Sequence, residues 1–115
     1  MPQSLFQSYM HIIFSTKNRQ IWLQDPGLRT ELCAYLAGGC KNLKCPAVIV
    51  NGYVDHVHLL VRMGKSISAP TLVGKIKQSS SKWIKTLAGS VSGFYWQAGY
   101  GVFGICASHI EATRQ

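Results

Sequence analysis

Long apolar runs and acidic side chains are what this sequence has least of. No apolar segment approaches the roughly 20 residues needed to cross a bilayer, which favours a water-soluble globule. The N-terminal stretch MPQSLFQSYMH also lacks the basic start and apolar block of a secretory signal peptide. We therefore expect a cytoplasmic protein without a membrane partner.

Closely spaced cysteine pairs are absent as well. Cys33, Cys40, Cys45 and Cys106 include no C-x-x-C spacing, which argues against the common zinc and redox motifs. Cys33 and Cys40 lie seven positions apart on a predicted helix, a spacing typical of core packing. We expect reduced thiols in the core, with a zinc site or disulfides as the alternative.

The scarcity of acidic residues leaves a strong positive charge. Twelve Lys and Arg face four Asp and Glu, for a net charge of +8. Such an excess on a small domain concentrates anions around it and favours a nucleic-acid partner. The alternatives are a solubility device, which acidic residues usually serve better, and an anionic membrane surface. No predicted helix carries lysine over its whole polar face, so the membrane ranks lower.

The 115 residues suit a single domain with one core. Composition and periodicity predict four strands, at 8–15, 47–50, 55–61 and, broken by its glycines, 94–105. Two helices separate them, one from Asp25-Pro26 to Cys45-Pro46 and one that begins around Ser68 and Pro70 and continues to Leu87.

The second and third strands must form a hairpin, because too few residues separate them for a crossover. Its turn lies at Asn51-Gly52 or slightly later, around 53–55. The order strand-helix-strand-strand-helix-strand predicts an α+β, ferredoxin-like split βαβ fold, with an antiparallel sheet and two helices on one face. Ser108 and Glu111 form a capping box, so a further helix starting near residue 109 could cross the open face.

His56 and His58 stand two apart on the third strand, so both side chains point to the same face of the sheet. One rigid strand thereby offers two imidazoles to a single divalent ion. The alternative is a histidine pair on the polar face of a half-buried strand. His11 lies within the first strand, and we expect it to be packed or hydrogen bonded rather than a metal ligand.

Two groups of basic residues are candidates for contacts to phosphates. Lys17 and Arg19 follow the first strand, and Lys75, Lys82 and Lys85 lie near one another on the polar side of the second helix. Both groups are equally compatible with ordinary solvated surface.

These pieces together resemble a known family. His56-Val57-His58 is similar to the histidine-hydrophobe-histidine motif of the HUH single-strand DNA endonucleases. The surroundings resemble the small tyrosine transposases of bacterial insertion sequences and those associated with repetitive palindromic elements. The matching segments run in order at 15–19 (STKNR), 40–45 (CKNLKC), 51–52 (NG), 55–61 (DHVHLLV), 72–83 (LVGKIKQSSSKW) and 96–103 (WQAGYGVF).

This resemblance implies a transposase that cleaves and rejoins single-stranded DNA bearing hairpins. His56 and His58, with a third polar ligand, would hold Mg²⁺ or Mn²⁺ at the scissile phosphate. A tyrosine hydroxyl would attack that phosphate and leave a phosphotyrosine intermediate. The resemblance also implies a homodimer whose sheets join edge to edge.

The sequence departs from the family at the nucleophile. The family tyrosine lies on the helix after the fourth strand and would come just after Gln115, followed by a glutamine that completes the metal site. None of Tyr9, Tyr35, Tyr53, Tyr95 or Tyr100 occupies that position. We therefore assign no catalytic residue in this chain and expect a single domain with an incomplete catalytic helix, its activity doubtful.

Two binding-only alternatives stay open. Gly99-Tyr100-Gly101-Val102-Phe103 resembles the aromatic stacking motif of RNA-recognition domains, which share this strand order but carry the motif on the third strand. A decayed transposase that only binds DNA is the other alternative. Metal-dependent nicking separates the enzyme from both.

Overall fold

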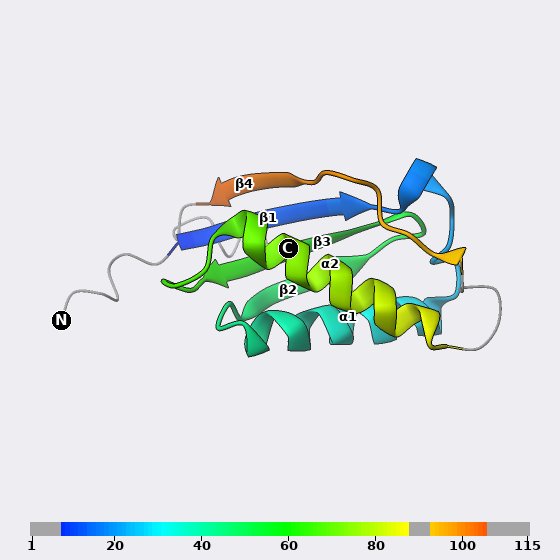
Figure 1. Ribbon diagram of the computed structural model, residues 1–115, viewed down its shortest axis with the longest axis horizontal. Helices are drawn as coiled ribbons and strands as arrows, with labels where there is room; N and C mark the ends of the chain where they lie inside the picture. Colours follow the sequence, from blue (N-terminus) through cyan, green and yellow to red (C-terminus); the bar gives the residue numbers. More distant parts are fainter. Residues whose placement is uncertain (1–7, 88–92, 106–115) are drawn as a thin grey trace.

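The computed structural model describes residues 8–87 and 93–105 (Figure 1). Its elements follow the predicted order, with one short 3-10 turn after the first strand. They are β1 (Ser8–Ser15), η2 (Lys17–Arg19), α1 (Pro26–Asn42), β2 (Ala47–Gly52), β3 (His56–Met63), α2 (Ala69–Lys85) and β4 (Gly101–Ile105). Neither helix is long and apolar enough to cross a membrane.

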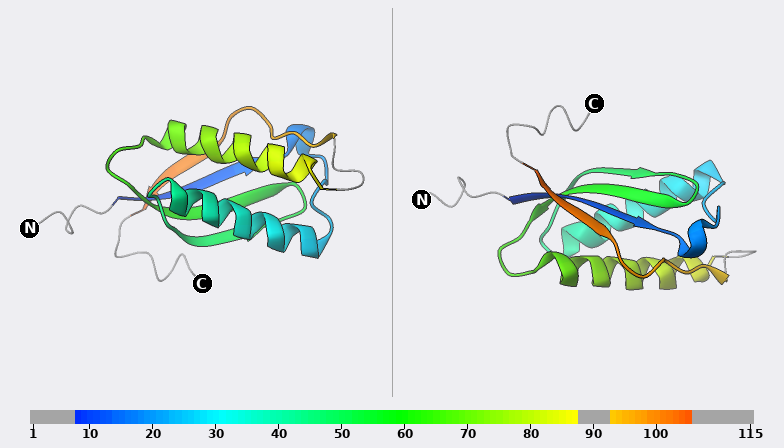
Figure 2. Two further views of the ribbon diagram at one scale, coloured as in Figure 1. Left: turned by 60° about the horizontal axis from the view of Figure 1, so that its bottom comes forward. Right: turned by 90° about the horizontal axis from the view of Figure 1, so that it is seen from above.

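The four strands form one antiparallel sheet in the order β2-β3-β1-β4. Both helices lie on one face of this sheet, as the two turned views in Figure 2 show. This arrangement is the ferredoxin-like fold expected from the order of elements. The opposite side, which neither helix covers, is called the open face below.

Alternation along the two central strands decides which residues face the helices. Ile12 and Phe14 of β1 and Val57, Leu59 and Val61 of β3 are almost fully buried. They form one core cluster with helix residues, among them Leu32 and Leu36 of α1 and Leu72 and Ile76 of α2. Side chains at the intervening positions therefore point to the open face.

Both helix starts lie at the predicted caps. The Asp25 carboxylate accepts a hydrogen bond from the Gly27 backbone N–H at 3.3 Å, and the Ser68 hydroxyl accepts one from the Thr71 N–H at 3.3 Å. Gly38-Gly39 does not interrupt α1. A Cβ on Gly39 would lie 3.6 Å from the Ile76 side chain, an ordinary van der Waals distance, so α2 packs beside α1 at this point and a methyl group would fit there.

The end of α1 differs from the predicted stop at Cys45-Pro46. The helix ends at Asn42 because Lys44 adopts a left-handed conformation, with φ of 65°. The Cys45 N–H then bonds back to the Cys40 carbonyl at 2.9 Å and the Lys44 N–H to the Lys41 carbonyl at 3.0 Å. This is a Schellman turn formed with lysine where glycine is usual.

The β2–β3 turn is the later of the two predicted. Asn51 and Gly52 belong to β2 and pair with His58 and Val57. The chain reverses immediately afterwards, where the Tyr53 N–H donates to the His56 carbonyl at 2.8 Å.

The fourth strand is shorter than predicted. Only Gly101–Ile105 forms a strand, while Trp96 makes a single bridge to Thr16. Between them Gly99 has a φ of +90°, and the Lys77 ammonium donates to the carbonyls of Gln97 (2.6 Å) and Gly99 (3.0 Å). These carbonyls therefore bond to a helix side chain instead of to a neighbouring strand. The helix predicted from residue 108 lies outside the described residues.

The cysteines in the described ranges are free thiols. Cys40 and Cys45 are buried and Cys33 is partly buried, in agreement with the predicted core role. Burial, followed by the neighbouring Cys45, raises the pKa of the Cys40 thiol to about 12. Cys106 lies outside the described residues.

Candidate functional site

His56 and His58 lie together on the open face, as their spacing predicted. Their ring centroids are 5.0 Å apart and the rings are tilted by 56°. Both side chains are partly buried. The pair therefore presents two neighbouring imidazoles from one strand.

The orientation of His56 is set by Asp55, the residue before it. The His56 Nδ1 atom lies 2.7 Å from the Asp55 carboxylate, and the Arg19 guanidinium donates to the same carboxylate at 3.0 and 3.4 Å. The hydrogen bond from His56 and then that from Arg19 lower the pKa of Asp55. An ionised carboxylate only accepts hydrogen bonds, so the neutral His56 ring carries its hydrogen on Nδ1 and its lone pair on Nε2.

His58 is held by a third histidine. Its Nδ1 lies 3.0 Å from the Nε2 of His11 on β1, so His11 is hydrogen bonded, as expected from the sequence. Burial, followed by the charges of His11 and His56, lowers the pKa of His58. His58 is therefore neutral at pH 7, which is the form of imidazole that binds a metal.

This arrangement fits a divalent cation in part. In both rings the protein engages Nδ1, and Nε2 is the remaining nitrogen. A carboxylate on the far nitrogen is the usual outer partner of a metal-binding histidine. Across 8–87 and 93–105, however, no three His, Cys, Asp or Glu side chains form a group that could hold an ion. His56 and His58 thus supply two ligands, and further ligands must come from elsewhere.

Tyr53 is a neighbour of this site that the sequence analysis did not place. Its ring stacks on His56, with centroids 4.5 Å apart and planes within 9° of parallel. Its only signal in the sequence is an aromatic residue in the turn before the histidine strand. The later position of that turn brings Tyr53 against His56.

Lys17 and Arg19 lie at the same end of the sheet as His56, because Ser15 pairs with His56 in the register. Both belong to the 3-10 turn, in which Asn18 and Arg19 have left-handed φ values of 58° and 55°. The Arg19 side chain is 62% exposed although it is bonded to Asp55. Arg19 thus holds the Asp55 carboxylate in place and still exposes its positively charged side chain to solvent.

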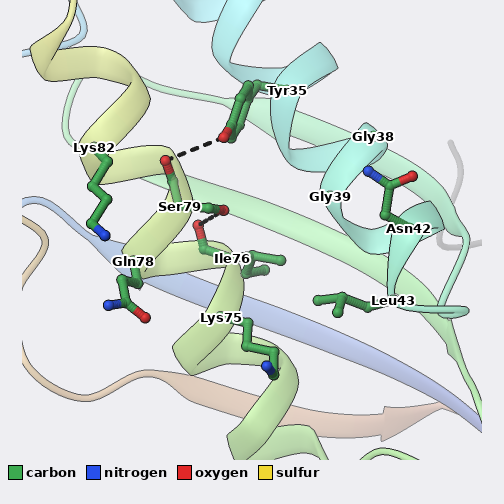
Figure 3. A pocket seen from close by; sticks show the side chains of 10 residues that line it. All are labelled: Tyr35, Gly38, Gly39, Asn42, Leu43, Lys75, Ile76, Gln78, Ser79 and Lys82. Atoms are coloured by element: carbon green, nitrogen blue, oxygen red, sulfur yellow. Dashed lines mark hydrogen bonds between the residues drawn. The ribbon is translucent and has the colours of Figure 1, made fainter.

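Lys75 and Lys82 line a cavity of about 620 Å³ between α1 and α2 (Figure 3). We call it the interhelical groove. Its other lining residues are mostly polar or small: Tyr35, Gly38, Gly39, Asn42, Leu43, Ile76, Gln78 and Ser79. Two ammonium groups beside amide and hydroxyl groups suit an anion such as a phosphate.

Lys85 does not belong to this groove. Its ammonium lies 3.7 Å from the centroid of the Tyr95 ring, a cation–π contact. The groove itself lies on the helical side of the sheet, across the core from His56 and His58. The structure therefore places the histidine pair and the interhelical groove on opposite sides of the sheet.

Comparisons with known proteins identify the family and support the fold. The model of the family described as "Transposase IS200 like" matches residues 4–115. A crystal structure described as a "putative transposase" from Deinococcus radiodurans R1 superposes with a TM-score of 0.77 at 23% identity, covering 96% of this chain and 87% of that one. A REP-associated tyrosine transposase bound to a REP hairpin gives 0.64 at 10% identity, covering 94% of this chain and 61% of that one.

These two structures share the fold, and no curated protein matches by sequence. The family match spans nearly the whole sequence, including both histidines. The chain therefore belongs to the IS200-like transposase family.

Proposed function

We propose that this chain is the DNA-processing domain of an HUH-type tyrosine transposase. Such a transposase cleaves and rejoins hairpin-bearing single-stranded DNA in a metal-dependent reaction through a phosphotyrosine intermediate, and the 115 residues of this chain lack the tyrosine that forms it. The observation that carries the proposal is the histidine pair on the open face. Each ring there has Nδ1 engaged by a neighbouring side chain and Nε2 as the remaining nitrogen.

His56 and His58 are the residues that would hold Mg²⁺ or Mn²⁺. A bound ion supplies Lewis-acid polarisation and orientation of the scissile phosphate. The protein contributes the positions of the rings. Asp55 fixes the tautomer of His56, Arg19 holds Asp55 in the ionised form, and His11 orients His58.

Metal binding is tested by thermal shift. Two imidazole ligands favour Mn²⁺ over Mg²⁺, so Mn²⁺ is expected to raise the melting temperature more. The His56→Ala variant should lose this stabilisation. Lys82→Ala, on the other face of the sheet, is the matched control and should keep it. An equal Mn²⁺ shift in His56→Ala and in the wild-type protein would refute the site.

The nucleophile is a separate question. We propose that it is a tyrosine of the family motif following residue 115, so the 115-residue chain should bind DNA without forming a covalent adduct. Appending a helical extension that begins with tyrosine and carries glutamine about four positions later, one helical turn, should restore an adduct that survives denaturation. Water as nucleophile would leave no adduct.

Tyr53 provides the control for this experiment, because its ring lies against His56. An adduct formed by the unextended chain and lost in Tyr53→Phe would assign the nucleophile to Tyr53 and overturn our placement. DNA binding without cleavage by the extended chain would instead favour the binding-only alternative.

The DNA partner and the assembly belong to the same proposal. Lys17 and Arg19 at the histidine end, and Lys75, Lys82 and Lys85 on α2, are the proposed phosphate contacts, and hairpin DNA is the preferred form. We also propose a homodimer, which light scattering of the purified protein in solution tests directly.

A further inference from the structure

Five aromatic rings form a continuous row over the open face. From β4 to the β2–β3 turn they are Phe103, His11, His58, His56 and Tyr53, and we call them the aromatic row. Successive ring centroids are 6.5, 5.1, 5.0 and 4.5 Å apart. The register explains the row, because Phe103 pairs with His11, and His11 lies diagonally across from His58.

The two ends of the row are its accessible part. Phe103 is 57% exposed and Tyr53 is 46% exposed, while the three histidines between them are partly buried. Tyr53 stacks nearly parallel on His56 and also meets His58 edge-on, with centroids 5.4 Å apart, so it lies against both rings of the pair. Two large aromatic rings thus stand on either side of the proposed metal-binding pair.

Positive charge borders the same surface. Arg62 of β3 is exposed and shares the face of His56 and His58 by strand alternation. The exposed guanidinium of Arg19 bonds to the Asp55 carboxylate, which also contacts His56. Aromatic rings combined with flanking cations are the features that hold unpaired nucleic-acid strands, because rings stack on bases and cations follow the phosphates.

We propose that Phe103 and Tyr53 are base-stacking positions for unpaired nucleotides on either side of the phosphate at the histidine pair. This inference rests on the proposed function and adds how the strand is positioned. Bases paired within a duplex do not offer their faces in this way, so the aromatic row selects single-stranded DNA at the reaction site. Stacking is tolerant of base identity, so the two residues fix the path of the strand more than its sequence.

The experiment compares an unpaired oligonucleotide with the same oligonucleotide carrying abasic sites. Binding of the 115-residue protein to each is measured by fluorescence anisotropy at constant salt. The wild-type protein should bind the intact strand more tightly, by on the order of tenfold for each stacked base removed. Phe103→Ala should lose about this factor on the intact strand and little on the abasic one.

Two further variants act as controls. Tyr95 is 55% exposed and lies against Lys85, a proposed phosphate contact, so Tyr95→Ala should leave the ratio of the two affinities unchanged. Phe103→Trp keeps a ring at the position and should retain the preference for the intact strand, which separates stacking from a general loss of structure. Tyr53→Leu, but not Tyr53→Phe, should reproduce the effect at the other end of the row.

Each adverse outcome has its own meaning. Equal wild-type affinity for intact and abasic strands would overturn base stacking while leaving DNA binding in place. No binding to either strand would overturn the proposed function as well. A changed oligomeric state in Phe103→Ala, with no change in DNA affinity, would assign the ring to a contact between two copies and overturn the inference.

Discussion

The two ring nitrogens of His56 and of His58 have different roles. Nδ1 of His56 and of His58 is engaged by a neighbouring side chain, and Nε2 is the nitrogen proposed to bind the metal ion. The partners come from different parts of the chain, since Asp55 lies in the turn and His11 on β1. The sequence showed the pair of rings, but the partners that orient them depend on the turn position and the strand register.

Asp55 gives a pH-dependent test of this arrangement. Its hydrogen bonds with His56 and Arg19 lower its pKa below the ordinary 3.8, so its carboxylate stabilises the fold above that pH. This contribution is lost as the pH falls through the lowered pKa. The wild-type protein should therefore melt at a higher temperature than Asp55→Asn at pH 7, and the gap should close at lower pH.

Circular dichroism melts at neutral pH and below about pH 3 measure both states. Glu31→Gln changes an exposed carboxylate on α1 and serves as the control for loss of a single negative charge. A gap of the same size at both pH values would contradict the role given to Asp55.

The cysteines allow a second test at the residue scale. Because burial raises the pKa of Cys40 to about 12, its thiolate population at pH 8 is very small. Iodoacetamide should therefore modify the partly buried Cys33 first and reach Cys40 only after unfolding in urea. Peptide mass spectrometry of the native and unfolded protein gives the order, and equal native rates at both cysteines would contradict it.

At the scale of elements, the end of α1 is fixed by a contact across the molecule. A Cβ on Gly64 would lie 2.6 Å from the carbonyl oxygen of Lys44, the residue in the left-handed turn. The loop after β3 therefore packs directly against the backbone that ends α1. Glycine is required at 64 by this close approach.

Gly64→Ala should lower the free energy of unfolding by roughly 1–3 kcal/mol, because backbone must move to admit the methyl group. Gly74→Ala is the matched control, since nothing lies within 4 Å of a Cβ there. Because Gly74 lies in the middle of α2, Gly74→Ala should raise the free energy of unfolding by about 0.5–1 kcal/mol. Urea unfolding measures both, and equal effects would show that the contact at Gly64 is unimportant.

These elements also show what sequence patterns can predict. The caps at Asp25 and Ser68 and the same-face geometry of His56 and His58 depend on neighbouring residues, and all were predicted correctly. The break of the fourth strand at its glycines was predicted as well. The end of α1 at Asn42 and the absence of 94–97 from the strand were not, because contacts distant in sequence, from Gly64 and Lys77, are made at these places. Lys77 illustrates this, since it looks like one more surface lysine until the fold brings it to the carbonyls of Gln97 and Gly99.

At the scale of the whole molecule, the sheet separates two surfaces with different proposed tasks. The open face carries the histidine pair, and the interhelical groove lies on the helical side. DNA that reaches both must pass around an edge of the sheet. We therefore expect substitutions on the two faces to affect different measurements.

Replacing Lys75, Lys82 and Lys85 by alanine should reduce the salt dependence of DNA binding by up to about 3 units in slope, since each phosphate contact contributes about 0.7–0.9. The Mn²⁺-induced rise in melting temperature should be unaffected. His56→Ala should instead lose the Mn²⁺-induced rise in melting temperature and keep the salt dependence of DNA binding. An unchanged slope in the triple variant would show that the lysines of α2 do not contact DNA.

The position of β1 in the sheet also governs how the protein folds during synthesis. This strand, Ser8–Ser15, lies between β3 and β4, yet β4 comes only at Gly101–Ile105. One edge of β1 thus keeps unpaired backbone groups until residues 101–105 have left the ribosome. Closing so long a loop slows folding, and an open strand edge can pair with other chains. The nascent chain is therefore prone to aggregate in the interval before β4 emerges.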